Sequence, residues 1–160
     1  STTAAMIMGD AVCASIMQLS DFSANDFARF HPGGSLGKSL LIKAKDLMNT
    51  KISFVSGEEL LPEVLLRISE GRLGFVCIGS KDSVQGIITD GDIRRAITQS
   101  KGSLSLMAKD IGSSSPLFIN ENTGLSEMNV IFRNKKILSL LVGNARELKG
   151  AVQFYDIHNG

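Results

Sequence analysis

The chain has 160 residues, of which 43% are hydrophobic and 21% are charged, and its formal net charge is +1. This composition is typical of a soluble globular protein, and the scattered charges argue against a nucleic-acid-binding surface, which needs a concentrated basic stripe. No apolar run reaches the length of a membrane-spanning helix and there is no signal peptide, so we expect no membrane partner. The chain begins with Ser1 rather than Met, which we interpret as a processed or truncated chain.

The cysteines indicate a reducing compartment. Cys13 and Cys77 are far apart in the sequence, and both lie among apolar residues. We therefore expect buried, reduced thiols, as in a cytoplasmic protein. The two cysteines and two histidines lack the spacing of a zinc site, so no metal site is expected.

The first forty residues are predicted to be helical and then irregular. Residues 4–17 form a helix pattern that is apolar on most faces, so we expect this helix to be buried against a partner outside this fragment, or else to be poorly ordered. Ser23 and Asp26 have the spacing of a capping box, and the short helix that follows should end at His31. Residues 32–39 nearly match a phosphate-binding P-loop. Pro32 stands where the first glycine is required and no strand precedes it, so we exclude an ATPase or GTPase.

From residue 43 the pattern is β-α-β-β-α. A helical turn at 44–48 precedes strands at 52–55, 74–78 and 84–89, with helices between the first two strands and at 90–100. The first of these helices has Pro62 in its first turn and Gly71 as its expected C-cap. The apolar residues of this helix are expected to form one face, which consists of Leu60, Leu61, Val64, Leu65 and Ile68.

The same unit occurs a second time without a gap. Gly150 aligns with Gly86 (150 − 86 = 64), and the same offset aligns residues 44–47 with 108–111. The second copy predicts a strand at 117–119, a helix carrying Leu125, Met128, Val130, Ile131 and Phe132, a hairpin of 138–142 and 148–153, and a final helix from Tyr155. A fixed period of this kind indicates two paired modules, and we expect their sheets and apolar helix faces to pack against each other about a pseudo-twofold axis.

The chain is organised around residues 86–92, Gly-Ile-Ile-Thr-Asp-Gly-Asp. A strand ends here and a helix begins, with Thr89 and Asp90 as N-cap types. The junction places a hydroxyl, free N–H groups and the Asp92 carboxylate together, which suits a phosphate and a ribose. The alternative is an ordinary capped strand-to-helix turn. The second copy keeps Asp156 but has Gln153 in place of threonine.

This repeated unit, with the G-x-x-T-x-x-D pattern at its last turn, resembles the cystathionine-β-synthase (CBS) domain pair over residues 43–160. The resemblance implies an α+β fold that senses adenosine nucleotides, with Thr89 on the phosphate and Asp92 on the ribose. The candidate nucleotide-binding residues are Gly86, Thr89, Asp90, Asp92 and Asp156. Because Gln153 departs from the family pattern, we expect one good site at most.

The N-terminal segment resembles the end of the sugar isomerase (SIS) domain of bacterial D-arabinose 5-phosphate isomerases. The residues that carry this likeness are Ser1–Ala5, Gly9–Ala11 and His31–Lys38. It implies an SIS tail at 1–42, CBS repeats at 43–104 and 105–160, and a cytoplasmic parent enzyme that interconverts D-ribulose 5-phosphate and D-arabinose 5-phosphate for Kdo in lipopolysaccharide or capsule. It also implies a homodimer or homotetramer, no required cofactor, and a regulatory adenine nucleotide or CMP-Kdo.

In that family the histidine of His-Pro-Gly-Gly is an active-site residue, which maps to His31. The alternative is that His31 only ends a helix. Three hypotheses follow: a regulatory nucleotide-binding module, a purely structural dimerisation module without ligand, and, least favoured, an enzyme site at His31 and Lys38. The remaining catalytic groups are missing from these residues, so we expect this chain to be inactive alone.

Overall fold

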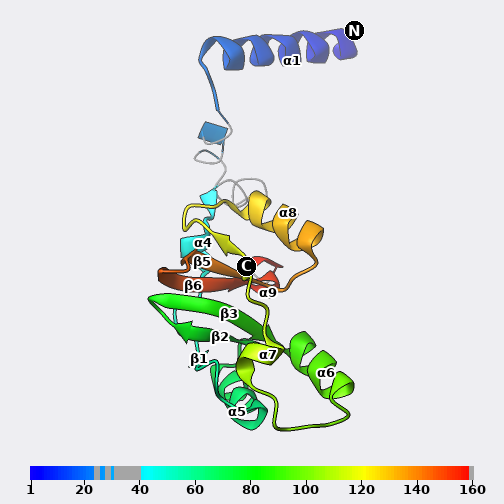
Figure 1. Ribbon diagram of the computed structural model, residues 1–160. Coiled ribbons are helices and arrows are strands. Elements are labelled where there is room, and N and C mark those ends of the chain that lie inside the picture. The colour runs from blue at the N-terminus through cyan, green and yellow to red at the C-terminus, as the bar shows by residue number, and fades with distance from the viewer. Residues whose placement is uncertain (24–25, 28–29, 31–40, 159–160) are drawn as a thin grey trace. The chain divides into compact units, whose positions relative to one another are not determined.

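The computed structural model describes residues 1–23, 26–27, 30 and 41–158. The chain divides into two compact units, Ser1–Ile42 and Lys43–Gly160. We describe each unit by itself, and Figure 1 shows the elements of both.

The described part of the first unit consists mainly of helix α1, Thr2–Leu19, whose N-cap side chain is that of Ser1. None of its residues is buried within the described chain, so our expectation that this helix is buried against a partner stays a prediction, whereas the expectation of a buried Cys13 is wrong here. Its apolar residues are distributed around the helix, and the exposed large ones are Met6, Ile7, Met8, Val12, Ile16, Met17 and Leu19. By length and composition alone α1 could also cross a membrane, which corrects our expectation, although core helices of soluble proteins pass the same test.

The second unit contains two three-stranded sheets of identical topology. The first sheet is built from β1 (Phe54–Val55), β2 (Phe75–Ser80) and β3 (Ser83–Thr89), and the second from β4 (Phe118–Ile119), β5 (Ser139–Asn144) and β6 (Glu147–Gln153). In each sheet the short first strand runs parallel to the middle strand, which pairs antiparallel with the third. Both registers slip once before the hairpin turn, so the copies match even at this irregularity.

Helices complete the predicted β-α-β-β-α order in both copies. They are α4 (Ala44–Leu47), α5 (Leu61–Gly71), α6 (Asp90–Gln99), α7 (Ala108–Ile111), α8 (Leu125–Lys135) and α9 (Phe154–His158). Pro62 lies in the first turn of α5 as predicted. The C-cap of α5 is Arg72, with a φ of 54°, rather than Gly71. Gly71 instead permits close packing, since a Cβ there would lie 2.5 Å from the Ser53 hydroxyl.

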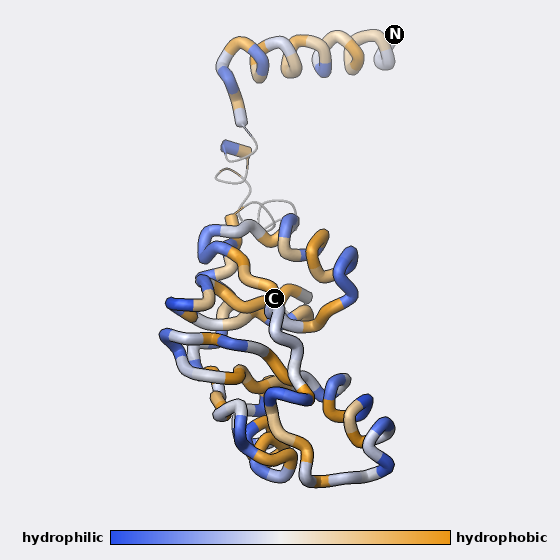
Figure 2. Tube along the Cα trace, in the orientation of Figure 1, coloured by the Kyte–Doolittle hydropathy of each residue, from blue (hydrophilic) through white to orange (hydrophobic). Residues whose placement is uncertain are grey.

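The two sheets pack face to face, which confirms part of the expected arrangement. Their shared core contains Leu73, Phe75, Cys77, Val84, Leu141, Leu148 and Ala151. Apolar segments, orange in Figure 2, run through the strands on both sides of this contact. Each large apolar side chain that is fully buried here contributes about 1.5–3 kcal/mol. Burial also raises the pKa of the Cys77 thiol to about 12.

The apolar helix faces do not join the two repeats, contrary to our expectation. Leu61, Val64 and Ile68 of α5 are buried in a core with the first sheet, and Met128 and Phe132 of α8 are buried in a core with the second sheet. Both faces of each sheet are apolar, so one face takes the helices and the other takes the partner sheet. The buried stripes are narrower than predicted, because three expected members are exposed, namely Leu60, Leu65 and Val130.

The short helices α4 and α7 are exchanged between the repeats. Ala44 of α4 is buried in the core of the second repeat, and Ala108 of α7 is buried in the core of the first. The Ala44 amide donates to the Thr123 carbonyl at 2.9 Å, and the Ala108 amide donates to the Glu59 carbonyl at 2.8 Å. Each packed lobe therefore takes its first helix from the other sequence repeat, and neither repeat is complete without its partner.

Candidate functional site

The turn after β3 forms a capping box at the start of α6. The Thr89 amide donates to Asp92 Oδ2 at 2.9 Å, and the Thr89 hydroxyl donates to the same oxygen at 2.6 Å. The Asp92 amide in turn donates to the hydroxyl oxygen of Thr89 at 3.4 Å. The structure thus brings together the hydroxyl, the carboxylate and the N–H groups of the helix start, which the sequence placed at this turn.

The Asp92 carboxylate is largely shielded and is held in its charged form. Its side chain is 16% exposed, and its Oδ1 accepts from the guanidinium of Arg95, one turn further along α6. Partial burial raises the pKa of this carboxyl, but the hydrogen bonds from Thr89 and the charge of Arg95 outweigh that effect and lower the pKa overall. An anionic acceptor therefore stands at the turn. Sequence reasoning missed Arg95, although its i,i+3 spacing from Asp92 signals such a pair.

Gly86 and Asp90 occupy different positions at this turn. Gly86 is buried in β3, where a Cβ would lie 2.7 Å from the Ser113 carbonyl oxygen, so the missing side chain lets the segment after α7 cross the strand. Asp90 is exposed, and its amide donates to the Gly74 carbonyl at 3.2 Å. The observed contacts of Gly86 and Asp90 are thus with the protein backbone.

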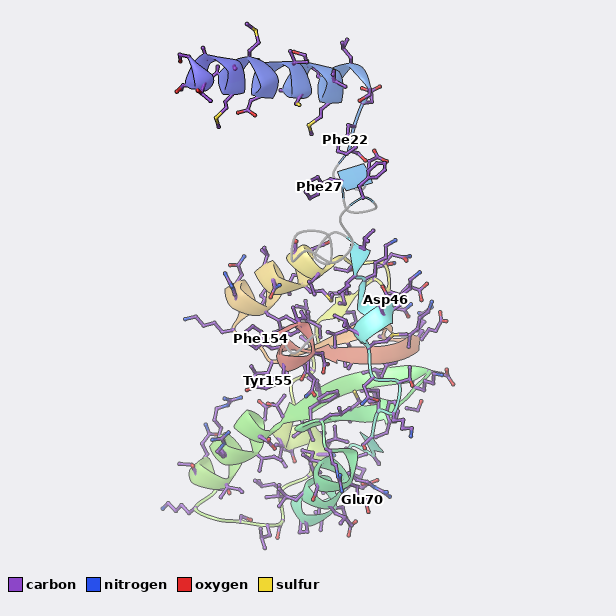
Figure 3. All side chains as sticks on the ribbon, turned by 180° about the vertical axis from the view of Figure 1, so that it is seen from behind. Phe22, Phe27, Asp46, Glu70, Phe154 and Tyr155 are labelled. Atoms are coloured by element: carbon purple, nitrogen blue, oxygen red, sulfur yellow. The ribbon has the colours of Figure 1, made fainter. Side chains whose placement is uncertain are left out.

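The second copy of the turn is built differently. The Gln153 amide donates to Asp156 Oδ2 at 2.8 Å, so the carboxylate keeps its capping role. The Gln153 side chain leaves the turn and donates to the Leu73 carbonyl of the first repeat. Phe154 packs edge-on against Phe132, with ring centroids 5.7 Å apart. Figure 3 shows Phe154 and Tyr155 side by side at the start of α9.

Capping geometry by itself does not identify a binding site. Ser23 and Asp26 make the same set of bonds, with the Ser23 amide and hydroxyl donating to Asp26 Oδ2 at 2.9 and 2.6 Å. The Lys43 amide likewise donates to Asp46 Oδ2 at 2.9 Å in α4, where Figure 3 labels Asp46. What distinguishes the Thr89 turn is its place at the end of β3, directly after the hairpin that β3 forms with β2.

Other candidate features lie elsewhere or outside the described residues. His31 and Lys38, and the whole near P-loop at 32–39, are outside them. No cluster of three or more metal-ligating side chains occurs among the residues that the structure describes. A shallow hollow on α6 is lined by Arg94, Arg95, Thr98 and Gln99. These residues lie from the fifth residue of α6 onward, beyond the N–H groups of the helix start, so we place the candidate site at Thr89.

Comparison with known proteins identifies proteins to which this chain is similar. Residues 44–99 match the family model of the CBS domain. The "Probable arabinose 5-phosphate isomerase" of Haemophilus influenzae is 40% identical over 158 residues, covering 96% of this chain and 47% of that protein. The chain is homologous to the arabinose 5-phosphate isomerases and contains a CBS domain. Arabinose 5-phosphate isomerase KpsF of Escherichia coli is 35% identical, covering 98% of this chain and 48% of that protein.

The chain thus spans about half the length of the curated isomerases it matches. Among solved structures, the CBS domain pair of protein MJ0100, in complex with 5′-methylthioadenosine and S-adenosyl-L-methionine, is similar with a TM-score of 0.66. The two share 18% sequence identity, and the match covers 74% of this chain and 94% of the other. At this identity the likeness establishes the CBS-pair fold and nothing about ligands, and it agrees with the two matching sheets of the second unit.

Proposed function

We propose that residues 43–160 form a regulatory CBS pair that binds a nucleotide at the Thr89–Asp92 turn. The observation that carries this proposal is the shielded Asp92 carboxylate, which is held ionised beside a hydroxyl and the start of a ten-residue helix. The family relationship supports the same assignment, and a CBS pair of the same fold was solved with adenosine derivatives. The regulatory ligand is an adenine nucleotide or a nucleotide sugar such as CMP-Kdo.

The geometry defines how such a ligand would compete for Asp92. The carboxylate accepts from the Thr89 hydroxyl on one oxygen and from Arg95 on the other. Two adjacent ribose hydroxyls would replace these donors, which would free the Thr89 hydroxyl and the Arg95 guanidinium for a phosphate. Ligand binding would thus replace the hydrogen bonds that Asp92 accepts from Thr89 and Arg95 by hydrogen bonds to the ligand.

Calorimetric titration of the 160-residue chain with AMP, ADP, ATP and CMP-Kdo tests the proposal. Asp92→Ala should weaken binding of the nucleotide that the parent chain binds by about 1–3 kcal/mol, the scale of a lost hydrogen bond to a charged group. Asp46→Ala is the matched control, because Asp46 has the same capping role in α4 but lies at a different turn. Equal affinity of the Asp92 variant and the parent chain would remove the assignment.

The second candidate function is a structural module that dimerises without a ligand. It is favoured by the second turn, where Gln153 and Phe154 make contacts within the protein. Under this alternative none of the four nucleotides produces binding heat, while light scattering still shows the dimer or tetramer that we propose from the family relationship. A chain that stays monomeric at high concentration contradicts the structural dimerisation module.

For the larger protein we propose a cytoplasmic isomerase that interconverts D-ribulose 5-phosphate and D-arabinose 5-phosphate for Kdo synthesis. Residues 1–42 would belong to its SIS domain, which would cover the exposed apolar surface of α1. His31 would move a proton in the aldose–ketose step, since imidazole titrates near neutral pH. In an isomerase that contains this chain, His31→Ala should reduce turnover strongly and leave nucleotide binding unchanged. Normal turnover would show that His31 only ends a helix.

A further inference from the structure

The contact between repeats contains one hydrogen bond that is made by one repeat alone. Two other hydrogen bonds across this contact form a symmetric pair: the Val84 amide donates to the Ala145 carbonyl at 2.8 Å, and the equivalent Leu148 amide donates to the Lys81 carbonyl at 3.0 Å. The Gln153 side chain donates to the Leu73 carbonyl across the same contact, 80 residues away in sequence. Thr89, which stands at the position equivalent to Gln153, instead uses its hydroxyl within its own turn. The Gln153 bond is therefore an addition made by one repeat alone.

On the side of the first repeat, this bond leads directly to the candidate nucleotide turn. Leu73 is followed by Gly74, whose carbonyl accepts from the Asp90 amide at 3.2 Å. Phe75 then pairs with Thr89 in the sheet. The segment held by Gln153 thus supports the first residue of α6 and the last residue of β3. A shift of Leu73 would be transmitted to Thr89 and Asp90 through backbone contacts.

On the side of the second repeat, the bond leads to the exchanged helix α4. Gln153 ends β6, and Ala151 of the same strand exchanges two backbone hydrogen bonds with Asn49, at 2.8 and 2.9 Å. Asn49 lies two residues after α4, which is buried against the second repeat. The chain enters the CBS pair at this helix, immediately after the boundary at Ile42.

We propose that Gln153 is a positioning residue that links the nucleotide turn to α4, so that occupancy of the turn is transmitted to the segment entering the CBS pair. This inference rests on the proposed nucleotide binding at Thr89–Asp92. It assigns Gln153 a role in place of the binding role that the equivalent threonine has in the first repeat. Contiguous contacts alone do not demonstrate coupling, so the test measures the coupling directly.

The test uses backbone amide NMR spectra of the 160-residue chain. Gln153→Glu keeps the length of the side chain but replaces the donor NH₂ with an acceptor, so it cannot bond to the Leu73 carbonyl. Gln85→Ala is the matched control, because Gln85 is an exposed glutamine on β3. Without ligand, Gln153→Glu should shift the Gly74 and Asp90 resonances, whereas Gln85→Ala should leave them unchanged. Unchanged resonances in Gln153→Glu would overturn the positioning role.

The ligand arm uses AMP at saturating concentration. In the parent chain and in Gln85→Ala, AMP should shift the resonances of Thr89–Asp92 and also that of Asn49. In Gln153→Glu the turn should still respond to AMP, while the Asn49 shift is lost. Loss of the Asn49 shift in Gln153→Glu supports the link. An Asn49 shift that persists in Gln153→Glu overturns the link, and so does a parent chain in which the turn responds to AMP while Asn49 does not. If AMP, ADP, ATP and CMP-Kdo all leave the resonances of the parent turn unchanged, the proposed nucleotide binding fails, and the ligand-free spectra still decide the positioning role.

Discussion

Replacing Gly86 by alanine should destabilise the CBS pair even without a ligand. The new Cβ would lie 2.7 Å from the Ser113 carbonyl oxygen and 3.2 Å from Cδ1 of Ile78. The first contact is with backbone, which cannot rotate away, so the segment after α7 must move. That movement strains two hydrogen bonds, from the Ile87 amide to Ser113 at 3.0 Å and from the Ser113 amide to Ile87 at 2.9 Å.

The magnitude follows from two terms. Overpacking a well-packed site costs about 1–3 kcal/mol. Weakening the two backbone hydrogen bonds adds at most about 1 kcal/mol for each bond. We therefore expect Gly86→Ala to lower the free energy of unfolding by about 1–5 kcal/mol, against the ~5–15 kcal/mol typical of a domain.

Urea denaturation followed by circular dichroism measures this loss. Gly150→Ala should behave alike, because its Cβ would lie 2.7 Å from the Asn49 carbonyl oxygen at the symmetry-related crossing. Gly57→Ala is the control, since its nearest contact, Lys109 Cβ at 3.6 Å, is an ordinary van der Waals distance. A Gly86→Ala protein as stable as Gly57→Ala would refute the close-approach argument.

Three further outcomes are expected. The pKa of Asp92 is lowered on folding, so its ionisation stabilises the fold above its unfolded pKa of ~3.9. This stabilisation is lost as the pH falls through the lower pKa of the folded state. In acid titrations, Asp92→Asn should lack the part of the pH-dependent stability that comes from Asp92. A thiol reagent at pH 8 should modify the exposed Cys13 at once and Cys77 only after denaturation, because burial raises the pKa of Cys77 to about 12; rapid labelling of both thiols in the native protein would contradict the buried core. Ala44→Gly should cost about 1–2 kcal/mol and speed hydrogen exchange mainly in β5 and β6, because α4 packs on the second repeat; faster exchange confined to the first sheet would disprove the exchange of helices.

The sequence by itself determined the repeated unit and most of its elements. The constant offset needed no gap, and the strands, the helix with Pro62 in its first turn and the turn at Thr89 have local signals. Those signals depend on residues within a few positions of each other, so they survive without knowledge of the fold. The capping box at Thr89 and Asp92 was predictable for the same reason.

Packing was less predictable, because a helix pattern shows that a face is buried without showing what covers it. Residues 4–17 have the composition of a buried helix, yet α1 has no buried residue in the described chain. The stripe of Leu61, Val64 and Ile68 predicted burial correctly but gave the wrong neighbour, since it lies on its own sheet rather than on the other repeat.

Only the tertiary structure decided how the repeats depend on each other. The exchange of α4 and α7, the crossing of Ser113 over Gly86 and the bond from Gln153 to Leu73 all join residues far apart in the chain. In the sequence, Gln153 was simply a departure from a motif, and Gly86 was a candidate ligand contact. Their roles depend on backbone atoms brought near by folding, and no local pattern of side chains encodes such a distance.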